Sequence, residues 1–484
     1  MAQKIFAPRR VGRPGAAGRP VDRGGPGEIV DLLVDQVVVA REHARVQAAA
    51  AAALKGSKKV VAELAVAYDN RCIGAGEPAS PAPAELLAHG VVLARAGAGF
   101  PGPVHLERFA SPARLCVTDE PRLAGVGGIG MLSLVVPSAT LAGALAGGRA
   151  TVREPVSVQV QLGGRLRPFV CAIDATFELI RRGLGDVVRR VEASRGAPVV
   201  LEFAGPSART LSVAERGVLA GVAPMVGAAG ALFVSDERTE VFLRDQRRSK
   251  AHRALAPDPG APFEDAVAMD LGAVDPLLLD GRGIVRAVRD LRGQPVAQVL
   301  LGGDRGTTLR DLFAAAALLK SKRVPQDLDF LLAVPSRQML EVLSRAGALA
   351  DFIAAGARIV EPDEGVTSGA LYRAVRGGVS MRSSDVDPSL GSAGIGGSGA
   401  ASSSGSAAGP FVVSAESLAY AVATGEVGDP RSFKRPVRVT VPRELPTDDV
   451  LVARSARPSR TIAPATAGAR PATSSAAAVA AAAT

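Results

Sequence analysis

Short, mostly apolar runs alternate with longer helix-like runs in the second half of the chain. This alternation restricts the fold more than any other feature of the sequence. The runs at 297–301, 330–334 and 358–360 predict strands, and the stretches 309–319 and 337–346 between them predict helices. Strands that alternate with helices form parallel sheets covered by helices on both faces. We therefore expect an α/β fold with parallel-rich sheets.

The first half of the chain shows weaker signs of the same pattern. An alanine-rich run favours a helix because alanine has the highest helix propensity. From residue 156 onward, apolar runs and amphipathic runs alternate again. These patterns predict helices at 46–54, 173–182 and 213–223, and strands at 59–68, 90–96, 156–162 and 199–203.

The length of the chain predicts several domains. At roughly 100–200 residues per domain, 484 residues correspond to about three. The ends differ in composition from the rest, because the first is rich in Arg, Gly and Pro and the last in Ala, Thr and Ser. We expect a disordered basic segment at 1–27, domains at 28–196, 197–293 and 294–440, a flexible Gly/Ser loop at 391–409, and a low-complexity tail at 441–484.

The positive charge lies at the two ends of the chain. The formal net charge is +10, but residues 1–26 contribute +5 and residues 431–484 contribute +6, which leaves −1 for residues 27–430. A nearly neutral body argues against a nucleic-acid-binding face on it. The basic ends would bind polyanions only weakly and without specificity.

Cysteine usage and hydropathy indicate a cytoplasmic protein. Cys72, Cys116 and Cys171 are far apart and form no Cys-x-x-Cys pair, so neither a disulfide framework nor a zinc site is indicated. The first residues lack the apolar region of a secretory signal, so we do not expect them to act as one. The uncharged stretches 124–148 and 217–234 are interrupted by glycines, and we expect them to be buried helices and loops rather than membrane spans.

Two glycine motifs resemble nucleotide-binding loops only weakly. Gly125-x-Gly-x-x-Gly130 has no acidic residue about 20 positions further on, as a dinucleotide site requires. The stretch GGDRGTT at 302–308 lacks the Gly-Lys-[Ser/Thr] ending of a phosphate loop. We expect neither to bind a nucleotide. The second nevertheless lies at the carboxyl end of a predicted strand, as does 361–369, and ligands bind at such ends in open α/β sheets.

Several stretches, taken together and in order, resemble the aconitase and 3-isopropylmalate dehydratase large-subunit family. They are VHLERFASP (104–112), GGIGML (127–132), LEFAGPSARTLSVAERG (201–217), LRDLFAAAALLK (309–320) and AVATGEVGDPRSF (421–433). The resemblance spans about 30–433. It implies a three-domain α/β/α body without the fourth, swivelling domain of the family. If the chain is active, it implies a hydro-lyase of the aconitate hydratase or isopropylmalate dehydratase class.

The resemblance also implies that the ligands of the family's [4Fe–4S] cluster are absent. The family holds this cluster through three cysteine thiolates, and the open iron acts on the substrate as a Lewis acid. The matching positions here are Asp304, Glu364 and Thr367. We therefore predict no cofactor, because the cysteine ligands of the cluster are absent. The hard carboxylates of Asp304 and Glu364 would nevertheless suit a divalent cation.

The substrate pocket differs from that of the family as well. The positions that correspond to a family histidine, asparagine and glutamate are Gly102, Gly221 and Met225, and its two carboxylate-binding arginines fall on Val386 and Gly391. Arginine is the side chain that binds carboxylates in a bidentate manner. The resemblance places the remaining polar residues of the former pocket at Asp69, Asn70, Glu120, Arg122 and Asp385.

These substitutions favour a non-catalytic member of the family, a pseudoenzyme that binds a protein partner or a small carboxylate ligand. Two alternatives remain open: a hydro-lyase for a hydroxy-carboxylic acid whose metal is held by Asp304 and Glu364, and an RNA-binding protein. A separate subunit that supplies a swivel-like domain is a further expected partner, because related isopropylmalate enzymes have one.

Overall fold

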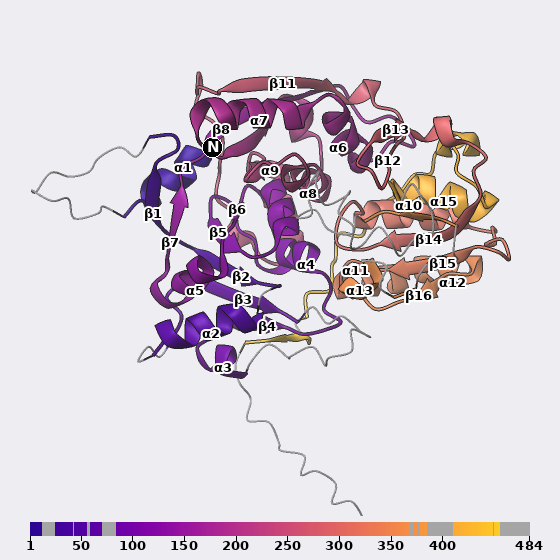
Figure 1. Ribbon diagram of the computed structural model, residues 1–484. Coiled ribbons are helices and arrows are strands. Elements are labelled where there is room, and N and C mark those ends of the chain that lie inside the picture. The colour runs from indigo at the N-terminus through magenta and orange to yellow at the C-terminus, as the bar shows by residue number, and fades with distance from the viewer. Residues whose placement is uncertain are drawn as a thin grey trace, which may run out of the picture.

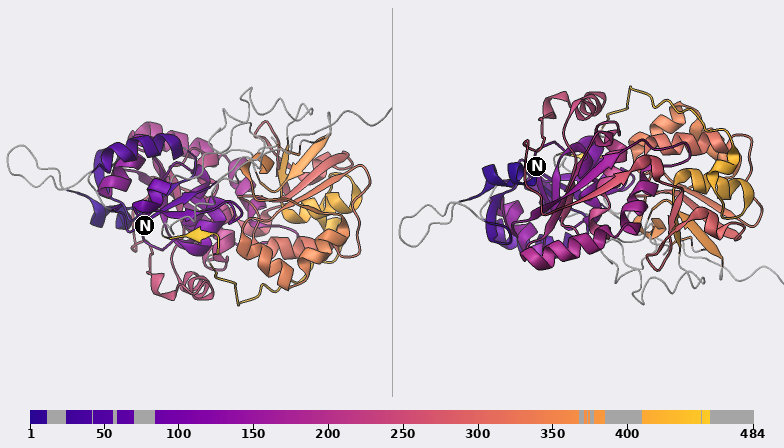
Figure 2. Two further views of the ribbon diagram at one scale, coloured as in Figure 1. Left: turned by 90° about the horizontal axis from the view of Figure 1, so that it is seen from below. Right: turned by 90° about the horizontal axis from the view of Figure 1, so that it is seen from above.

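Three sheets with flanking helices form the body of the protein (Figure 1). The computed structural model describes residues 1–11, 25–41, 43–55, 59–69, 84–367, 371–372, 374, 378–384, 410–448 and 450–454. Figures 1 and 2 show the last of the three sheets, with its helices, beside the other two. The predicted α/β fold with parallel-rich sheets is confirmed.

The first sheet has six strands in the order β19-β4-β3-β2-β5-β6, and only β19 runs antiparallel to its neighbour. Valines and alanines fill its buried strands, which suits a sheet covered on both faces. Its strands are β2 (Gln36–Val39), β3 (Leu64–Tyr68), β4 (Val92–Ala94), β5 (Leu115–Thr118), β6 (Leu132–Val135) and β19 (Val452–Ala453). The helices of this region are α2 (His43–Ala53), α3 (Ala84–Ala88), α4 (Pro101–Arg108) and α5 (Ser138–Gly147).

The second sheet is fully parallel, in the order β10-β9-β8-β11. Its strands are β8 (Val156–Gly163), β9 (Val199–Ala204), β10 (Gly230–Leu232) and β11 (Asp265–Asp270). Its helices are α6 (Ala172–Arg181), α7 (Leu184–Arg195), α8 (Val213–Ala220) and α9 (Glu237–Asp245). The strand β8 pairs with β9, although the predicted boundaries assign these strands to different domains; the boundaries themselves stay predictions.

The third sheet has seven strands in the order β13-β12-β18-β17-β14-β15-β16, with β12 antiparallel to both of its neighbours. Its strands are β12 (Leu277–Leu279), β13 (Val285–Ala287), β14 (Val296–Gly302), β15 (Asp329–Ala333), β16 (Arg358–Ile359), β17 (Val379–Arg382) and β18 (Phe411–Val413). Its helices are α10 (Leu309–Leu319), α11 (Arg337–Arg345), α12 (Ala348–Ala355), α13 (Glu364–Thr367) and α15 (Ala415–Thr424).

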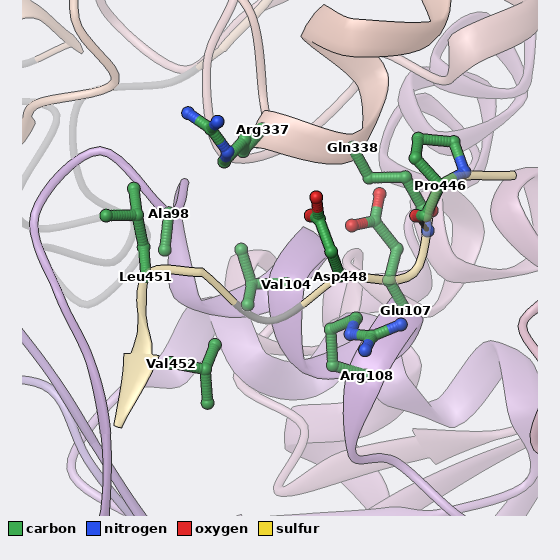
Figure 3. A pocket seen from close by; sticks show the side chains of 10 residues that line it. All are labelled: Ala98, Val104, Glu107, Arg108, Arg337, Gln338, Pro446, Asp448, Leu451 and Val452. Carbon is green, nitrogen blue, oxygen red and sulfur yellow. Dashed lines mark hydrogen bonds between the residues drawn. The ribbon is translucent and has the colours of Figure 1, made fainter. Parts of the chain in front are cut away.

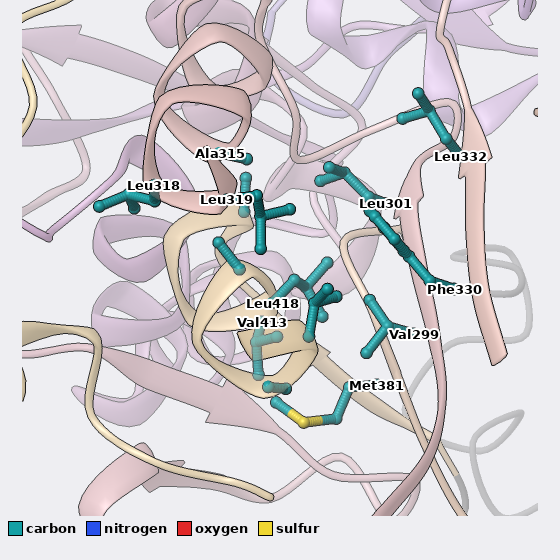
Figure 4. Close-up of a cluster of buried hydrophobic side chains, with 14 of the residues drawn as sticks. Val299, Leu301, Ala315, Leu318, Leu319, Phe330, Leu332, Met381, Val413 and Leu418 are labelled. Atoms are coloured by element: carbon teal, nitrogen blue, oxygen red, sulfur yellow. The ribbon is translucent and has the colours of Figure 1, made fainter. Parts of the chain in front are cut away.

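The core of the third sheet shows why the predicted helix at 309–319 has the predicted bounds. Leu312, Leu318 and Leu319 of α10 are buried in one apolar cluster with strand residues such as Leu301 and Phe330. Figure 4 shows part of this cluster. Thr308 caps the helix, because its hydroxyl accepts the N–H of Asp311 while the Asp311 carboxylate accepts the N–H of Thr308.

The glycine motif at 125–130 has a packing role. It lies in the 3-10 segment η2 (Pro121–Ile129), which packs closely against α8. A Cβ atom on Gly128 would lie 2.4 Å from the backbone nitrogen of Gly217. The uncharged stretch 124–148 forms parts of η2 and α5 and also the strand β6, where only helices and loops were expected. No helix in the described part of the chain is long and apolar enough to cross a membrane.

Two predictions about the ends of the chain are wrong for part of their length. Residues 1–11 were expected to be disordered, but they form α1 (Ala2–Phe6) and the turn η1 (Ala7–Arg9), because Ile5 and Phe6 are buried in an apolar cluster. Residues 12–24 lie outside the described residues. Within the tail expected from 441 onward, β19 pairs with β4, while residues 455–484 lie outside the described part.

The remaining elements are short. The strand β1 (Ile29–Leu33) pairs with β7 (Arg149–Arg153) in a separate antiparallel sheet. Single 3-10 turns lie at Ser207–Arg209, Ala223–Met225, Ser249–Ala251, Leu271–Ala273, Val288–Leu291 and Pro430–Phe433. The Gly/Ser loop expected at 391–409 falls outside the described residues.

Candidate functional site

A small cavity of about 70 Å³ lies where α4, η2, α8 and the loop after β14 meet. Its lining includes Gly102, Arg122, Gly221 and Asp304, each at a position that the resemblance assigns to the family's active site. These four residues span more than two hundred positions of the sequence. Their convergence in one cavity supports the correspondence on which the predicted site rests.

The loop after β14 forms one wall of this cavity at the carboxyl end of the strand, where ligand sites of α/β sheets occur. Gly302 has a φ of +105°, and a Cβ atom there would lie 1.9 Å from the carbonyl oxygen of Ala333. Only glycine fits this turn, since other residues rarely adopt such a φ and would collide with β15. The turn places Asp304 at the cavity.

Arg122 holds two buried carboxylates at this site. Its Nε and Nη2 donate to the two oxygens of Glu120, each at 2.9 Å, which is a bidentate contact. On its other side, Nη1 lies 2.8 Å from Oδ2 of Asp304. The hydroxyl of Ser384 donates to Oδ1 of Asp304. All three charged side chains are almost completely buried.

A second arginine completes the charge balance around Glu120. Nε of Arg41 donates to Oε2 of Glu120 at 2.8 Å. The backbone N–H groups of Ala40 and Arg41 donate to the carboxylate of Asp119, which fixes the loop that carries Arg41. Burial alone would raise the pKa of Glu120, but Arg122 and Arg41 together hold it below its ordinary value. Glu120 therefore stays ionised as part of the network.

Arg305 occupies space next to this network. Its Nη1 donates to the carbonyl oxygen of Gly221 at 3.3 Å. A Cβ atom on Gly221 would lie 3.2 Å from Cδ of Arg305, so the position has no room for a larger residue unless this arginine moves. The arginine thus occupies space that the resemblance assigns to a family asparagine.

The structure places the other predicted site residues only in part. Asp69 directly follows β3, and its N–H donates to the carbonyl oxygen of Ala94 at 2.8 Å. Asn70 and Asp385 lie outside the described residues. Glu364 and Thr367 begin and end α13, but their side chains are not among those the structure describes. Their membership of the site stays a prediction.

The described cysteines do not face this cavity. Cys116 in β5 is buried in the core beside the first sheet, and Cys171 in a separate cluster beside α6. Burial raises the pKa of both thiols. Cys72 lies outside the described residues. In the described part of the chain, no group of three His, Cys, Asp or Glu side chains could hold a metal ion.

The donors at the Asp304 loop therefore do not fit a [4Fe–4S] cluster. Such a cluster needs thiolates, and the loop presents a carboxylate that is already paired with a guanidinium group. We derive no chemical step through this cofactor.

A second pocket was not predicted from the sequence. It lies beside α4 and α11, and Pro446, Asp448, Leu451 and Val452 line it as well (Figure 3). The buried Glu107 lines it and accepts a hydrogen bond of 2.8 Å from the hydroxyl of Ser336. Burial raises the pKa of Glu107 to about 8, although Ser336 and Arg108 lower it. The composition around 104–112 gives no sign of this burial.

The histidine of the same stretch, His105, is structural. Nδ1 and Nε2 of His105 lie 2.9 Å from the hydroxyl of Tyr68 and from Oε1 of Gln36. Burial, with a smaller contribution from Arg248, lowers the pKa of His105 to about 3, so the imidazole is neutral. It ties α4 to β2 and β3.

The fold matches the one that the resemblance predicts, and comparison with known proteins agrees. Residues 84–282 match the aconitase family (aconitate hydratase). This match and the curated relatives support membership of the aconitase and 3-isopropylmalate dehydratase large-subunit family.

Its relatives include large subunits of several hydro-lyases. It is 31% identical over 270 residues to 3-isopropylmalate dehydratase large subunit 2 of Archaeoglobus fulgidus. The aligned region covers 55% of this chain and 62% of that relative. It is 28% identical over 380 residues to the homoaconitase large subunit of Thermus thermophilus. This alignment covers 76% of this chain and 84% of the relative. The match thus spans less than two thirds of the Archaeoglobus protein.

Proposed function

We propose that this chain is an aconitase-family protein that works by binding a partner or a small ligand and does not catalyse a hydro-lyase reaction. The observation that carries the proposal is the ion pair between Arg122 and Asp304. Asp304 takes the position of a cluster ligand, and Arg122 neutralises it from a position that the resemblance assigns to a family histidine.

A buried arginine at this point disfavours both a cluster and a cation. A positive ion at Asp304 would have to displace the guanidinium group 2.8 Å away. Displacement would leave Arg122 buried with one carboxylate fewer, and breaking a buried pair costs about 3–5 kcal/mol.

The remaining space is also too small for the chemistry of the family. A cavity of about 70 Å³ has room for only a few water molecules. A tricarboxylic or branched dicarboxylic acid needs more room, and it needs arginines that are free to bind its carboxylates. At this cavity Arg122 is committed to Glu120 and Asp304.

A separate small subunit is the first protein partner to consider. Relatives of this chain are named large subunits, which implies a small subunit for those proteins. We propose that the surface around this cavity binds such a subunit or its equivalent. The altered hydro-lyase that uses Asp304 and Glu364, and the RNA-binding protein, stay predictions without an observation in their favour.

An activity assay tests the proposal. The full chain is reconstituted anaerobically with iron and sulfide and assayed with isopropylmalate and with aconitate, with and without the Archaeoglobus small subunit. The Archaeoglobus large subunit, treated in the same way, is the positive control. We expect turnover by the control alone. Iron-dependent turnover by this chain would contradict the proposal, and turnover with Mn²⁺ that is lost in Asp304→Ala would support the altered hydro-lyase.

A further inference from the structure

A third cavity is larger than the site of Arg122 and Asp304 and shares no lining residue with it. Its volume is about 640 Å³, and its walls come from the loop 165–170, the turn 210–215, the start of α10 and the segment 436–438. Leu166, Phe169 and Leu211 give it apolar walls. Small-molecule sites are concave, mostly apolar and supplied with a few convergent polar groups.

Arginines dominate the polar lining of this cavity. They are Arg165, Arg167, Arg238, Arg310 and Arg438. Only two carboxylates, Glu215 and Glu416, line it with them, which leaves a net charge of +3 when both are ionised. Four of these arginines and both carboxylates lie within residues 27–430, which as a whole carry a formal charge of −1. The cavity is therefore a local concentration of positive charge on a nearly neutral body.

Most of these arginines are not committed to the fold. Within the described residues, Arg165, Arg238 and Arg438 have no ion-pair partner. Arg167 has a contact of 3.5 Å with Asp275, and Nη1 of Arg310 lies 3.9 Å from Oδ1 of its neighbour Asp311. Guanidinium groups without a carboxylate partner remain available for a bidentate contact with an anion.

Glu416 supplies an independent indication of a ligand. It is the second residue of α15 and is only 7% exposed, yet its Oε2 has no hydrogen-bond partner in the described part of the chain. A buried polar atom of this kind costs free energy unless something binds it. Because Glu416 lines the cavity, a bound molecule could supply the missing hydrogen bond.

The charges around Glu416 decide which form of its carboxyl group is present. Asp311 and Arg310 of α10 face it, as do Asp174 of α6 and the thiol of Cys171. Burial and then Asp311 raise its pKa to about 7, against the opposing effect of Arg310. A protonated Glu416 can donate a hydrogen bond to an anionic oxygen.

We propose that this cavity binds a small polyanion, a molecule with at least two phosphate or carboxylate groups. The arginines would bind the anionic groups, and the carboxyl of Glu416 would donate to one of their oxygens. The arginines converge on one cavity instead of following a surface, which favours a small molecule over a nucleic acid. The proposal does not depend on the state of the Arg122–Asp304 cavity.

Calorimetric titration of the full chain at 0.15 M salt tests this proposal, with pyrophosphate and citrate as probes. We expect saturable binding with one molecule per chain. Binding of pyrophosphate alone would assign phosphate chemistry, binding of citrate alone carboxylate chemistry, and binding of both a general polyanion site. Absence of saturable binding for both probes would overturn the proposal.

Matched variants locate the binding. Arg238→Gln with Arg438→Gln should weaken it at least about tenfold, since each charge-assisted contact is worth more than a kilocalorie per mole. Arg282→Gln with Arg292→Gln removes the same charge from exposed positions outside the cavity and should change it less than about twofold. Equal weakening in both pairs would overturn the proposal. So would a single-stranded oligonucleotide that binds more tightly than both probes and depends on Arg238 and Arg438.

The pH dependence of anion binding tests whether Glu416 donates a hydrogen bond to the ligand. Binding should be tighter at pH 6 than at pH 8, because the protonated carboxyl donates to the anion and the ionised one repels it. Glu416→Gln can donate at both pH values and should remove most of the difference. A pH dependence that is unchanged in Glu416→Gln would contradict this role.

Discussion

Arg122 joins two buried carboxylates that come from distant parts of the sequence. Glu120 lies two residues away, whereas Asp304 is brought to it by the loop after β14. Buried ion pairs contribute little net stability when intact, but removal of one partner leaves an uncompensated charge in the interior. The network therefore has a clear signature in single substitutions.

Arg122→Ala should lower the free energy of unfolding by about 3–5 kcal/mol, because Glu120 and Asp304 then remain buried without their shared partner. Urea denaturation measures the change. Arg189→Ala removes an exposed arginine that pairs with Asp186 on α7 and should cost less than about 1 kcal/mol. A loss for Arg122→Ala as small as that of this control would show that the network contributes little to the fold.

Glu107 should make stability depend on pH in the direction opposite to an ordinary carboxylate. Its pKa in the folded protein is about 8, above the ordinary value of 4.5, so the folded state binds a proton that the unfolded state has lost. Its contribution is complete below pH 4.5 and is lost as pH rises toward 8, by at most about 1.4 kcal/mol per pH unit.

Denaturation midpoints between pH 5 and pH 8 check this expectation. Glu107→Gln should flatten the curve relative to the unchanged protein, and Glu237→Gln, an exposed carboxylate of α9, should not. Parallel curves for the unchanged protein and Glu107→Gln would mean that Glu107 is ionised in the folded state.

At the scale of elements, the helices and strands around 297–346 were predictable because each has a full period of apolar residues. The strand expected at 59–68 is wrong for its first half, since β3 begins only at Leu64. The expected bounds of α10 agree with the structure, and those of β14 and α11 differ by one residue. The short elements α1 and β19 were not predictable, since Ile5 and Phe6 stand alone among basic residues and β19 has only two residues. Their order comes from tertiary contacts, which override local composition.

The contact between η2 and α8 depends on glycine at Gly128. Gly128→Ala would place a Cβ atom 2.4 Å from the backbone of Gly217 and should cost about 1–3 kcal/mol or more. Gly143→Ala, in the exposed face of α5, meets no atom within 4 Å and should stabilise the protein by about 0.4–1 kcal/mol. Thermal unfolding of the two variants compares them directly; equal midpoints would contradict the close packing of η2 on α8.

At the scale of the whole molecule, the resemblance predicted which residues meet but not what they do together. It assigned Gly102, Arg122, Gly221 and Asp304 to one site, and the structure brings them into one cavity. The contacts of Arg41 and Ser384 were not predictable, since spacing along the chain carries no information on loop side chains. The arginine cavity was missed for a similar reason, because its lining residues lie up to 273 positions apart in the sequence.

The most direct test of the central claim is the content of iron, sulfide and divalent metal in the full chain after anaerobic reconstitution. A protein whose cluster position is closed by Arg122 and Asp304 should contain neither iron nor sulfide in stoichiometric amounts, and no bound Mg²⁺ or Mn²⁺. About four iron and four sulfide ions per chain, the content of one cubane cluster, would contradict the claim. One divalent ion per chain that is lost in Asp304→Ala would contradict it as well.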